Sequence, residues 1–142
     1  MSTEQNKATT RRLVEELNKG NLSVIDELVG ADYVGHGAGG TIQGPEEFKQ
    51  SRRTISSAFP DWHSTVEDIT AEGETVVVRL TLSGTHKGTF SGVAATGKQF
   101  RVSCAIINRF AAGKIVESWN FADAMGIYQQ LGIAPPTGRT TG

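Results

Sequence analysis

The sequence has little of several features that would point to a particular class of protein. Cys104 is the only cysteine among 142 residues, which excludes a disulfide within the chain and a cysteine-based metal cluster. No apolar run approaches the ~20 residues of a membrane-spanning helix. The polar segment 1–12 lacks the apolar stretch of a secretory signal. From these absences we expect a soluble, cytoplasmic protein.

An excess of either charge is also missing. The chain carries 14 Lys and Arg against 15 Asp and Glu, a formal net charge of −1. This balance gives no electrostatic reason to expect nucleic acid or an anionic membrane as a partner. A length of 142 residues suits one domain with a single core. We expect this domain to span residues 1–134, with a short, polar and flexible tail from Pro135 to Gly142.

Helical patterns fill the first half of the chain. An apolar stripe predicts a first helix capped by Thr3, and Ser23 begins a capping box that predicts a short second helix. Pro45 at a first helical position and Pro60 at the end delimit a third helix. The glycine-rich segment 31–41, between the second and third helices, is expected to be a loop.

Strand patterns fill the second half. β-branched and alternating residues predict strands over 64–69, 75–82, 99–110 and 114–123, mostly joined by short turns. Sequential strands with short connections favour antiparallel pairing. Helices followed by strands indicate an α+β fold, in which about three N-terminal helices pack on one face of the sheet. A short amphipathic helix over 124–132 completes the pattern.

The sequence contains no complete motif for phosphate or metal binding. The segment Gly92–Lys98 has the spacing of a phosphate-binding loop up to its lysine. Gln99 then stands where Ser or Thr would bind magnesium, and a predicted strand follows instead of a helix, so we interpret the segment as a glycine-rich hairpin. None of the histidines His36, His63 and His86 has metal-ligand spacing to another ligand. We therefore expect no metal and no cofactor.

Strand alternation predicts where a pocket lies. Cys104, Ile106 and Asn108 share the helix-facing side of their strand with Phe110. An apolar surface that carries one amide fits a small-molecule pocket, but Asn108 is equally well explained as a buried polar residue bonded to backbone. Trp62, just after the third helix, is a candidate wall of the same pocket.

The last predicted strand runs into Asp123, at the junction with the final helix. Burying a bare carboxylate among Trp119, Phe121 and Met125 is unfavourable, so the acid must be paired, protonated or used. Alternatively it is an ordinary N-cap of the helix. Strict alternation places Asp123 with Trp119 and opposite Asn120, and a β-bulge would change which set faces the helices. The residues alone leave this open.

Short segments along the chain match one known family. They are Asn18–Gly20, Asp32–Val34 with His36, Phe59–Trp62, Gly84–His86, Arg109-Phe110, Gly113–Glu117 with Trp119, and Asp123 with Gln129–Gly132. Their order and spacing resemble the SnoaL-like polyketide cyclase family, within the nuclear transport factor 2-like superfamily. The resemblance implies a cone-shaped, curved sheet wrapped around helices, with a deep pocket inside. It also matches Asp123 with the family's acid/base aspartate.

The resemblance implies a reaction as well. Family cyclases close a ring by intramolecular aldol condensation, without metal or cofactor. The implied catalytic residues are Asp123, which would move the proton, and His36, which could hydrogen-bond the developing enolate. The partner would be a small hydrophobic or aromatic ligand such as a polyketide. The expected substrate-binding residues are Tyr33, Trp62, Cys104, Ile106, Asn108, Trp119 and Asn120.

Other functions of the same fold stay open. The superfamily includes isomerases, epoxide hydrolases, cofactor-independent hydroxylases and non-catalytic binding or scaffold proteins, and fold alone does not decide among them. A cyclase needs Asp123 inside the pocket near polar partners, whereas a binding protein needs only the cavity.

Self-association is the remaining expectation. On the predicted strand 75–82, Val76, Val78 and Leu80 alternate with Val77, so both faces of the strand carry apolar residues. One face serves the core and the other needs cover. We therefore expect a homodimer formed through the outer face of the sheet.

Overall fold

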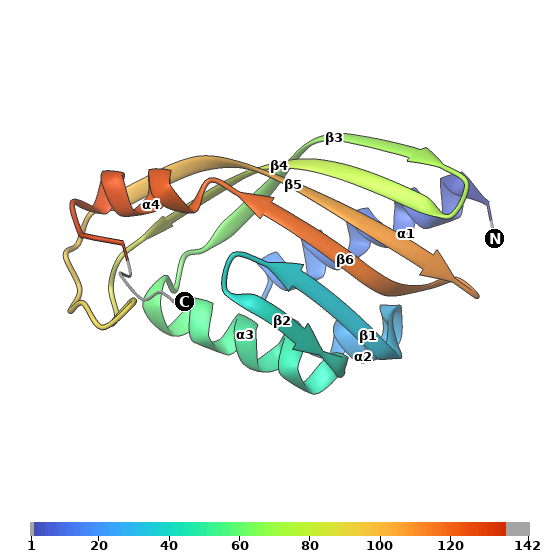
Figure 1. Ribbon diagram of the computed structural model, residues 1–142, viewed down its shortest axis with the longest axis horizontal. Coiled ribbons are helices and arrows are strands. Elements are labelled where there is room, and N and C mark those ends of the chain that lie inside the picture. Colours follow the sequence, from blue (N-terminus) through green and yellow to red (C-terminus); the bar gives the residue numbers. More distant parts are fainter. Residues whose placement is uncertain (1, 136–142) are drawn as a thin grey trace.

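The computed structural model describes residues 2–135, so the expected tail lies outside the described residues except for its first residue. The predicted α+β fold is confirmed (Figure 1). The helices are α1 (Thr3–Asn18), α2 (Ser23–Leu28), α3 (Gly44–Ala58) and α4 (Ala124–Leu131). The strands are β1 (Val29–Gly37), β2 (Gly40–Gln43), β3 (His63–Glu72), β4 (Thr75–Thr85), β5 (Gln99–Ala111) and β6 (Lys114–Ala122).

One curved, mixed sheet carries the fold. Its strand order is β2-β1-β6-β5-β4-β3, and every pairing is antiparallel except the parallel pairing of β1 with β6. Helix α1 packs against β3 and β4, and α3 packs against β1 and β2. Figure 1 shows the long strands running from α4 towards the N-terminal end of α1, with the β1–β2 hairpin beside α3.

The expected loop over 31–41 is wrong, because this segment forms most of the β1–β2 hairpin. Its glycines lower the strand propensity, so the strand pattern is not visible in the sequence. Gly35, however, is required by the packing of a neighbouring side chain. A Cβ at Gly35 would lie 2.6 Å from the hydroxyl oxygen of Tyr33, so only glycine lets the Tyr33 side chain lie along the strand. The pairing ends at Gly37 and Gly40, and Gly40 has the positive φ of 112° that the turn requires.

Two predicted helix caps also differ. Ser2, not Thr3, caps α1: its hydroxyl accepts from the Gln5 backbone N–H, and the Gln5 side chain completes a capping box. Helix α2 has no side-chain cap at Leu22, because the Ser23 hydroxyl instead bonds to Asn21. Neighbouring hydroxyls compete for one helix end, and the sequence pattern does not decide between them.

The two faces of the central strands follow the predicted alternation. On β4, Val76, Val78 and Leu80 are buried, whereas Val77 on the opposite face is 39% exposed. On β5, Asn108 and Phe110 are likewise buried on the side that meets the helices. This side is called the inner face below, and the opposite side the outer face.

A β-bulge in β6 decides which residues at the end of this strand face the helices, a point that strand alternation left open. Phe110 pairs with Ile115, but Arg109 pairs with Glu117, so Val116 is an extra residue in β6. Beyond the bulge the alternation is reversed. Ser118, at 6% exposure, is therefore an inner residue like Ile115, and Trp119 moves to the outer face while Asn120 lies on the inner face.

Candidate active site

The candidate site lies where β6 loses its neighbour. The last pair between β1 and β6 is His36 with Trp119. Strand β6 continues through Asn120 to Ala122 and then enters α4 (Figure 1). A notch is left between the tip of the β1–β2 hairpin and the start of α4. Both faces of the sheet are accessible from such an interrupted edge.

A hollow of about 710 Å³ occupies this notch, which is within the usual range for small-molecule sites. The inner face contributes Cys104, Asn120 and Ala122, and the hairpin tip contributes His36, Gly37 and Ala38. The remaining lining residues are Arg79, Ser103, Ala105, Trp119, Phe121 and Asp123. Of the expected site residues, the hollow therefore brings together Asp123, His36, Cys104, Trp119 and Asn120.

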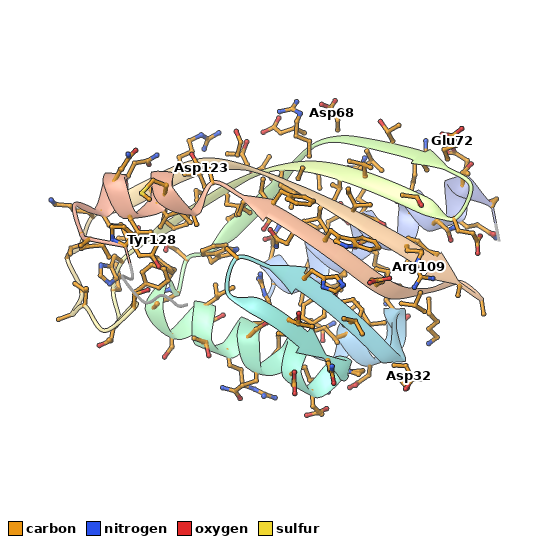
Figure 2. The ribbon with its side chains drawn as sticks, viewed as in Figure 1. Asp32, Asp68, Glu72, Arg109, Asp123 and Tyr128 are labelled. Carbon is orange, nitrogen blue, oxygen red and sulfur yellow. The ribbon has the colours of Figure 1, made fainter. Side chains whose placement is uncertain are left out.

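Asp123 stands at the start of α4, where Figure 2 labels it. Its Oδ1 accepts from the Gly126 backbone N–H at 2.9 Å, so Asp123 is the N-cap of the helix. A Cβ at Gly126 would lie 2.3 Å from Oδ2, so the carboxylate needs glycine at that position. The residue is exposed, and Oδ2 has no hydrogen-bond partner within residues 2–135. The capping role and a role towards a ligand are compatible, because each uses a different oxygen.

His36 approaches the hollow from the outer face, within a cluster of polar side chains. Its Nε2 lies 2.7 Å from Oε2 of Glu117, and its ring stacks on Trp119 with a centroid separation of 5.6 Å. Arg109 donates to the other Glu117 oxygen at 3.0 Å. Hydrogen bonds from His36 and then Arg109 hold the pKa of Glu117 below its ordinary value. The imidazole is thus anchored through Nε2, which leaves Nδ1 for a ligand.

Tyr33 and Asn108 are not in the hollow but deeper in the cone. The Asn108 side chain accepts from the Ser118 hydroxyl at 2.6 Å and donates to the Thr10 hydroxyl at 3.4 Å. Its bonds go to side chains rather than to backbone. Tyr33 is 3% exposed and packs its ring on Phe48. Burial raises the pKa of Tyr33, and the neighbouring Ser118 lowers it by a smaller amount.

The remaining expected pocket residues divide between core and hollow. Trp62 packs against Phe59 and Phe100 in the core, and its indole nitrogen is buried without a partner in the described chain. Ile106 is half-buried on the inner face and pairs with Asn120. The Cys104 thiol donates to Oδ1 of Asn120 at 3.4 Å. Burial raises the pKa of Cys104 to about 11, so the sulfur is a thiol at neutral pH and a poor nucleophile.

Sequence reasoning missed Glu117 and Gly37 at this site. Glu117 could not be paired with His36 before the parallel β1–β6 pairing was known. Gly37 was assigned to a loop. Over residues 2–135 no group of three metal-ligating side chains is found, and no helix there is long and apolar enough to cross a membrane.

Comparison with known sequences agrees with the resemblance seen in the segments. The sequence profile of the SnoaL-like polyketide cyclases matches residues 7–131. Aklanonic acid methyl ester cyclase DnrD of Streptomyces peucetius is 33% identical over 132 residues, which cover 89% of this chain and 90% of DnrD. The curated relatives are named as cyclases, which supports an enzymatic role for this chain.

Comparison with solved structures gives the same fold. IdmH of Streptomyces antibioticus, described as a proposed polyketide cyclase, has a TM-score of 0.82 and 33% identity over 91% of this chain and 99% of its own. AclR of Streptomyces galilaeus, described as a proposed hydroxylase, has a TM-score of 0.84 and 29% identity, covering 94% of this chain and all of AclR. With its nuclear transport factor 2-like fold and a profile match across nearly its whole length, the chain belongs to the SnoaL-like polyketide cyclase family.

Proposed function

We propose that this protein is a polyketide cyclase that closes a ring by intramolecular aldol condensation, with Asp123 as the single acid/base residue. The observation that carries the proposal is the position of Asp123. Its carboxylate lies on the hollow, with one oxygen fixed by the helix and the other free of partners in the described chain. The substrate class follows from the relatives, whose name specifies aklanonic acid methyl ester.

The proposed reaction is balanced without a cofactor. A carbon flanked by two carbonyl groups loses a proton to the Asp123 carboxylate, and the electron pair is delocalised as an enolate. That carbon forms a bond to a ketone carbon of the same molecule, and the π bond of the ketone breaks. The resulting alkoxide takes the proton back from Asp123. The product has the same atoms as the substrate, so no oxidant, nucleotide or leaving group is needed.

The surroundings of Asp123 suit this role. A ligand that fills the hollow would cover the exposed carboxylate and exclude water from it. Holding the chain of the substrate folded supplies a large part of the rate, because the two carbons are then already close together. The amide of Asn120 is a candidate to donate to the substrate oxygens. His36 donates to Glu117 through Nε2, so its Nδ1 can accept from a substrate hydroxyl, and it can donate to a substrate oxygen when both ring nitrogens carry protons. Trp119 offers a flat apolar surface beside them.

The test is Asp123→Asn, assayed with aklanonic acid methyl ester. Asparagine caps a helix about as well as aspartate, so folding should survive while kcat falls by about 10²–10⁴. Binding of the substrate should be nearly unchanged. Asp32→Asn is the matched control, because Asp32 is an exposed carboxylate on β1 that Figure 2 shows far from Asp123. Undiminished turnover by Asp123→Asn would end the catalytic claim.

A non-catalytic or different chemical role is the second candidate. It is favoured by the cap itself, which gives Asp123 a structural role, and by AclR, a protein of similar fold described as a proposed hydroxylase. If Asp123 is only a cap, Asp123→Asn has little effect on any readout, and Asp123→Ala loses roughly 0.5–2 kcal/mol of stability. A binding protein would then retain its affinity for the ester without converting it.

We also propose that two copies associate through the outer face of the sheet. Val77 and Phe121 lie on this face and are 39% and 61% exposed, and Phe121 also lines the hollow. Exposed apolar side chains on one sheet face are typical of an interface, and a twofold dimer is the commonest closed arrangement.

A further inference from the structure

The contact between His36 and Glu117 is made by the pairing of two strands. In the parallel pairing of β1 with β6, Val34 lies beside Glu117 and His36 lies beside Trp119. The bulge at Val116 brings Glu117 and Trp119 to the outer face of the sheet, from which His36 approaches the hollow. The two side chains therefore meet on regular, hydrogen-bonded backbone, which holds their relative position.

The same contact decides which nitrogen of His36 carries the proton. Nε2 lies 2.7 Å from Oε2 of Glu117, and Arg109 donates to Oε1 through Nη2 at 3.0 Å and through Nε at 3.3 Å. These partners keep Glu117 ionised at neutral pH, and an ionised carboxylate can only accept. Nε2 is therefore the donor, so in the neutral imidazole Nδ1 carries a lone pair and can only accept.

The His36 ring is fixed at its face as well as at Nε2. It stacks on Trp119 with a centroid separation of 5.6 Å and an angle of 22° between the ring planes. The side chain of His36 is 38% exposed and that of Glu117 is 24% exposed, so the ring is the more accessible member of the pair. His36 lines the hollow, and within residues 2–135 no hydrogen bond is found for its Nδ1. The hollow thus contains an oriented acceptor that the described chain does not use.

His86 is a useful contrast, because its Nδ1 is occupied by the protein itself. His86 is fully buried, and its Nδ1 accepts from the backbone N–H of Thr96 at 3.2 Å. Its ring packs beside those of Phe59 and Phe90. The hydrogen bond and the packing give His86 a structural role. In His36 the same nitrogen has no partner in the described chain and the ring borders a hollow, so His36 is the histidine available to a ligand.

We propose that the hollow selects ligands with an enolic or phenolic hydroxyl, which donates to Nδ1 of His36, and that Glu117 is the positioning residue that keeps Nδ1 an acceptor. The proposal rests on the proposed function, which makes the hollow the substrate site. The carbon between two carbonyl groups that the reaction requires gives the substrate such a hydroxyl, because this unit enolises. A ketone, ester or ether oxygen cannot donate, so neutral His36 does not hold it. A site built for a hydroxyl discriminates against analogues that lack it.

The test compares 2-naphthol with 2-methoxynaphthalene, which has the same rings but no donor, by calorimetry. The wild type should bind naphthol about tenfold more tightly, as for one hydrogen bond. In Glu117→Gln the amide can donate to Nε2 as well as accept from it, so the tautomer is no longer fixed. The preference for naphthol should then fall to about threefold or less. His36→Phe keeps a ring that can stack on Trp119 and removes the acceptor, so the preference should disappear.

NMR of the imidazole nitrogens separates positioning from a purely structural role. The wild type should show the proton of neutral His36 on Nε2, and Glu117→Gln should show a mixture of tautomers. Glu27→Gln is the matched control: Glu27 also pairs with an arginine, Arg12, but does not line the hollow, so both affinities and the tautomer should stay unchanged. The proposal is overturned if naphthol does not bind the wild type, if the wild type binds both ligands equally, if Nδ1 carries the proton, or if Glu117→Gln keeps the full preference.

The outcome is distinguishable from that of the proposed function. With aklanonic acid methyl ester, Glu117→Gln should raise KM and change kcat by less than about threefold, whereas Asp123→Asn lowers kcat at a nearly constant KM. If the wild type does not cyclise the ester but Glu117→Gln loses the preference for naphthol, the cyclase proposal fails and the hydroxyl site stands. If Asp123→Asn abolishes turnover while Glu117→Gln leaves KM and the preference unchanged, the cyclase proposal stands and this inference fails.

Discussion

Asn108 and Asn120 are the same residue type, on neighbouring strands and on the same face of the sheet, but their surroundings differ. Asn108 is 4% exposed, and its amide is bonded to hydroxyl groups on β6 and α1. Asn120 is exposed, and the only hydrogen bond found for its side chain within residues 2–135 is the one from the Cys104 thiol at 3.4 Å. At the end of the cone where Asn108 lies, called the closed end below, polar side chains are bonded to other residues of the protein. At the end where Asn120 lies, called the open end below, polar side chains stay available to a ligand.

The largest effect expected from this contrast is on stability. Asn108→Ala leaves the hydroxyls of Ser118 and Thr10 without their partner in a dry interior, and each unpaired buried group is expensive. We expect the free energy of unfolding to fall by about 3 kcal/mol. Asn120→Ala, the matched variant at the open end, should change it by less than about 0.5 kcal/mol. Urea denaturation of both proteins measures the difference, and equal losses would remove the distinction between the two ends.

The next effect concerns the outer face at the open end. Phe121→Ser removes an apolar side chain that is 61% exposed in one copy, so it should weaken the proposed dimer by about 2 kcal/mol. Met125→Ser is the control, because Met125 is also exposed, at 51%, but lies on α4 rather than on the sheet. Light scattering at micromolar concentration should give twice 15.2 kDa for the wild type and the control. A wild-type mass of one chain would exclude the dimer.

The closed end was the more predictable of the two from sequence. Apolar alternation on β4 and β5 correctly assigned Val76, Cys104 and Asn108 to one face, because a packed core demands that pattern. The helix order and the α+β class followed from the same periodicity. Asp123 was also placed correctly at the strand–helix junction, with the cap as one of its two interpretations.

The open end depends on features that no local pattern specifies. The bulge at Val116 arises from how β6 pairs with β5, so the face of Trp119 could not be known beforehand. The β1–β2 hairpin was hidden by glycines that serve packing, as at Gly35. The pairing of His36 with Glu117 joins residues far apart in sequence. Sites formed by strand ends and long-range pairs require the topology first.

The smallest expected effect concerns the outer-face cluster, which consists of His36, Arg109 and Glu117. It tests whether the contacts within this cluster stabilise the fold. The pKa of folded Glu117 lies below its ordinary value of 4.5, chiefly because of the hydrogen bond with His36. A lowered folded-state pKa means that the ionised carboxylate stabilises the fold at pH values above the ordinary pKa. This contribution is lost as the pH falls through the folded-state pKa. Glu117→Gln should therefore lower Tm slightly at about pH 7, and the difference from the wild type should shrink below about pH 4.5.

Glu72→Gln provides the control, since Glu72 is an exposed carboxylate at the end of β3 that Figure 2 labels at the other end of the sheet from Asp123. It removes a charge that has no side-chain partner in the described chain, so its Tm should follow that of the wild type across the same pH range. If Glu117→Gln also follows the wild type, the His36–Glu117 contact contributes nothing measurable to folding. The cluster would then resemble the open end, with its groups held for a ligand or a second copy rather than for the fold.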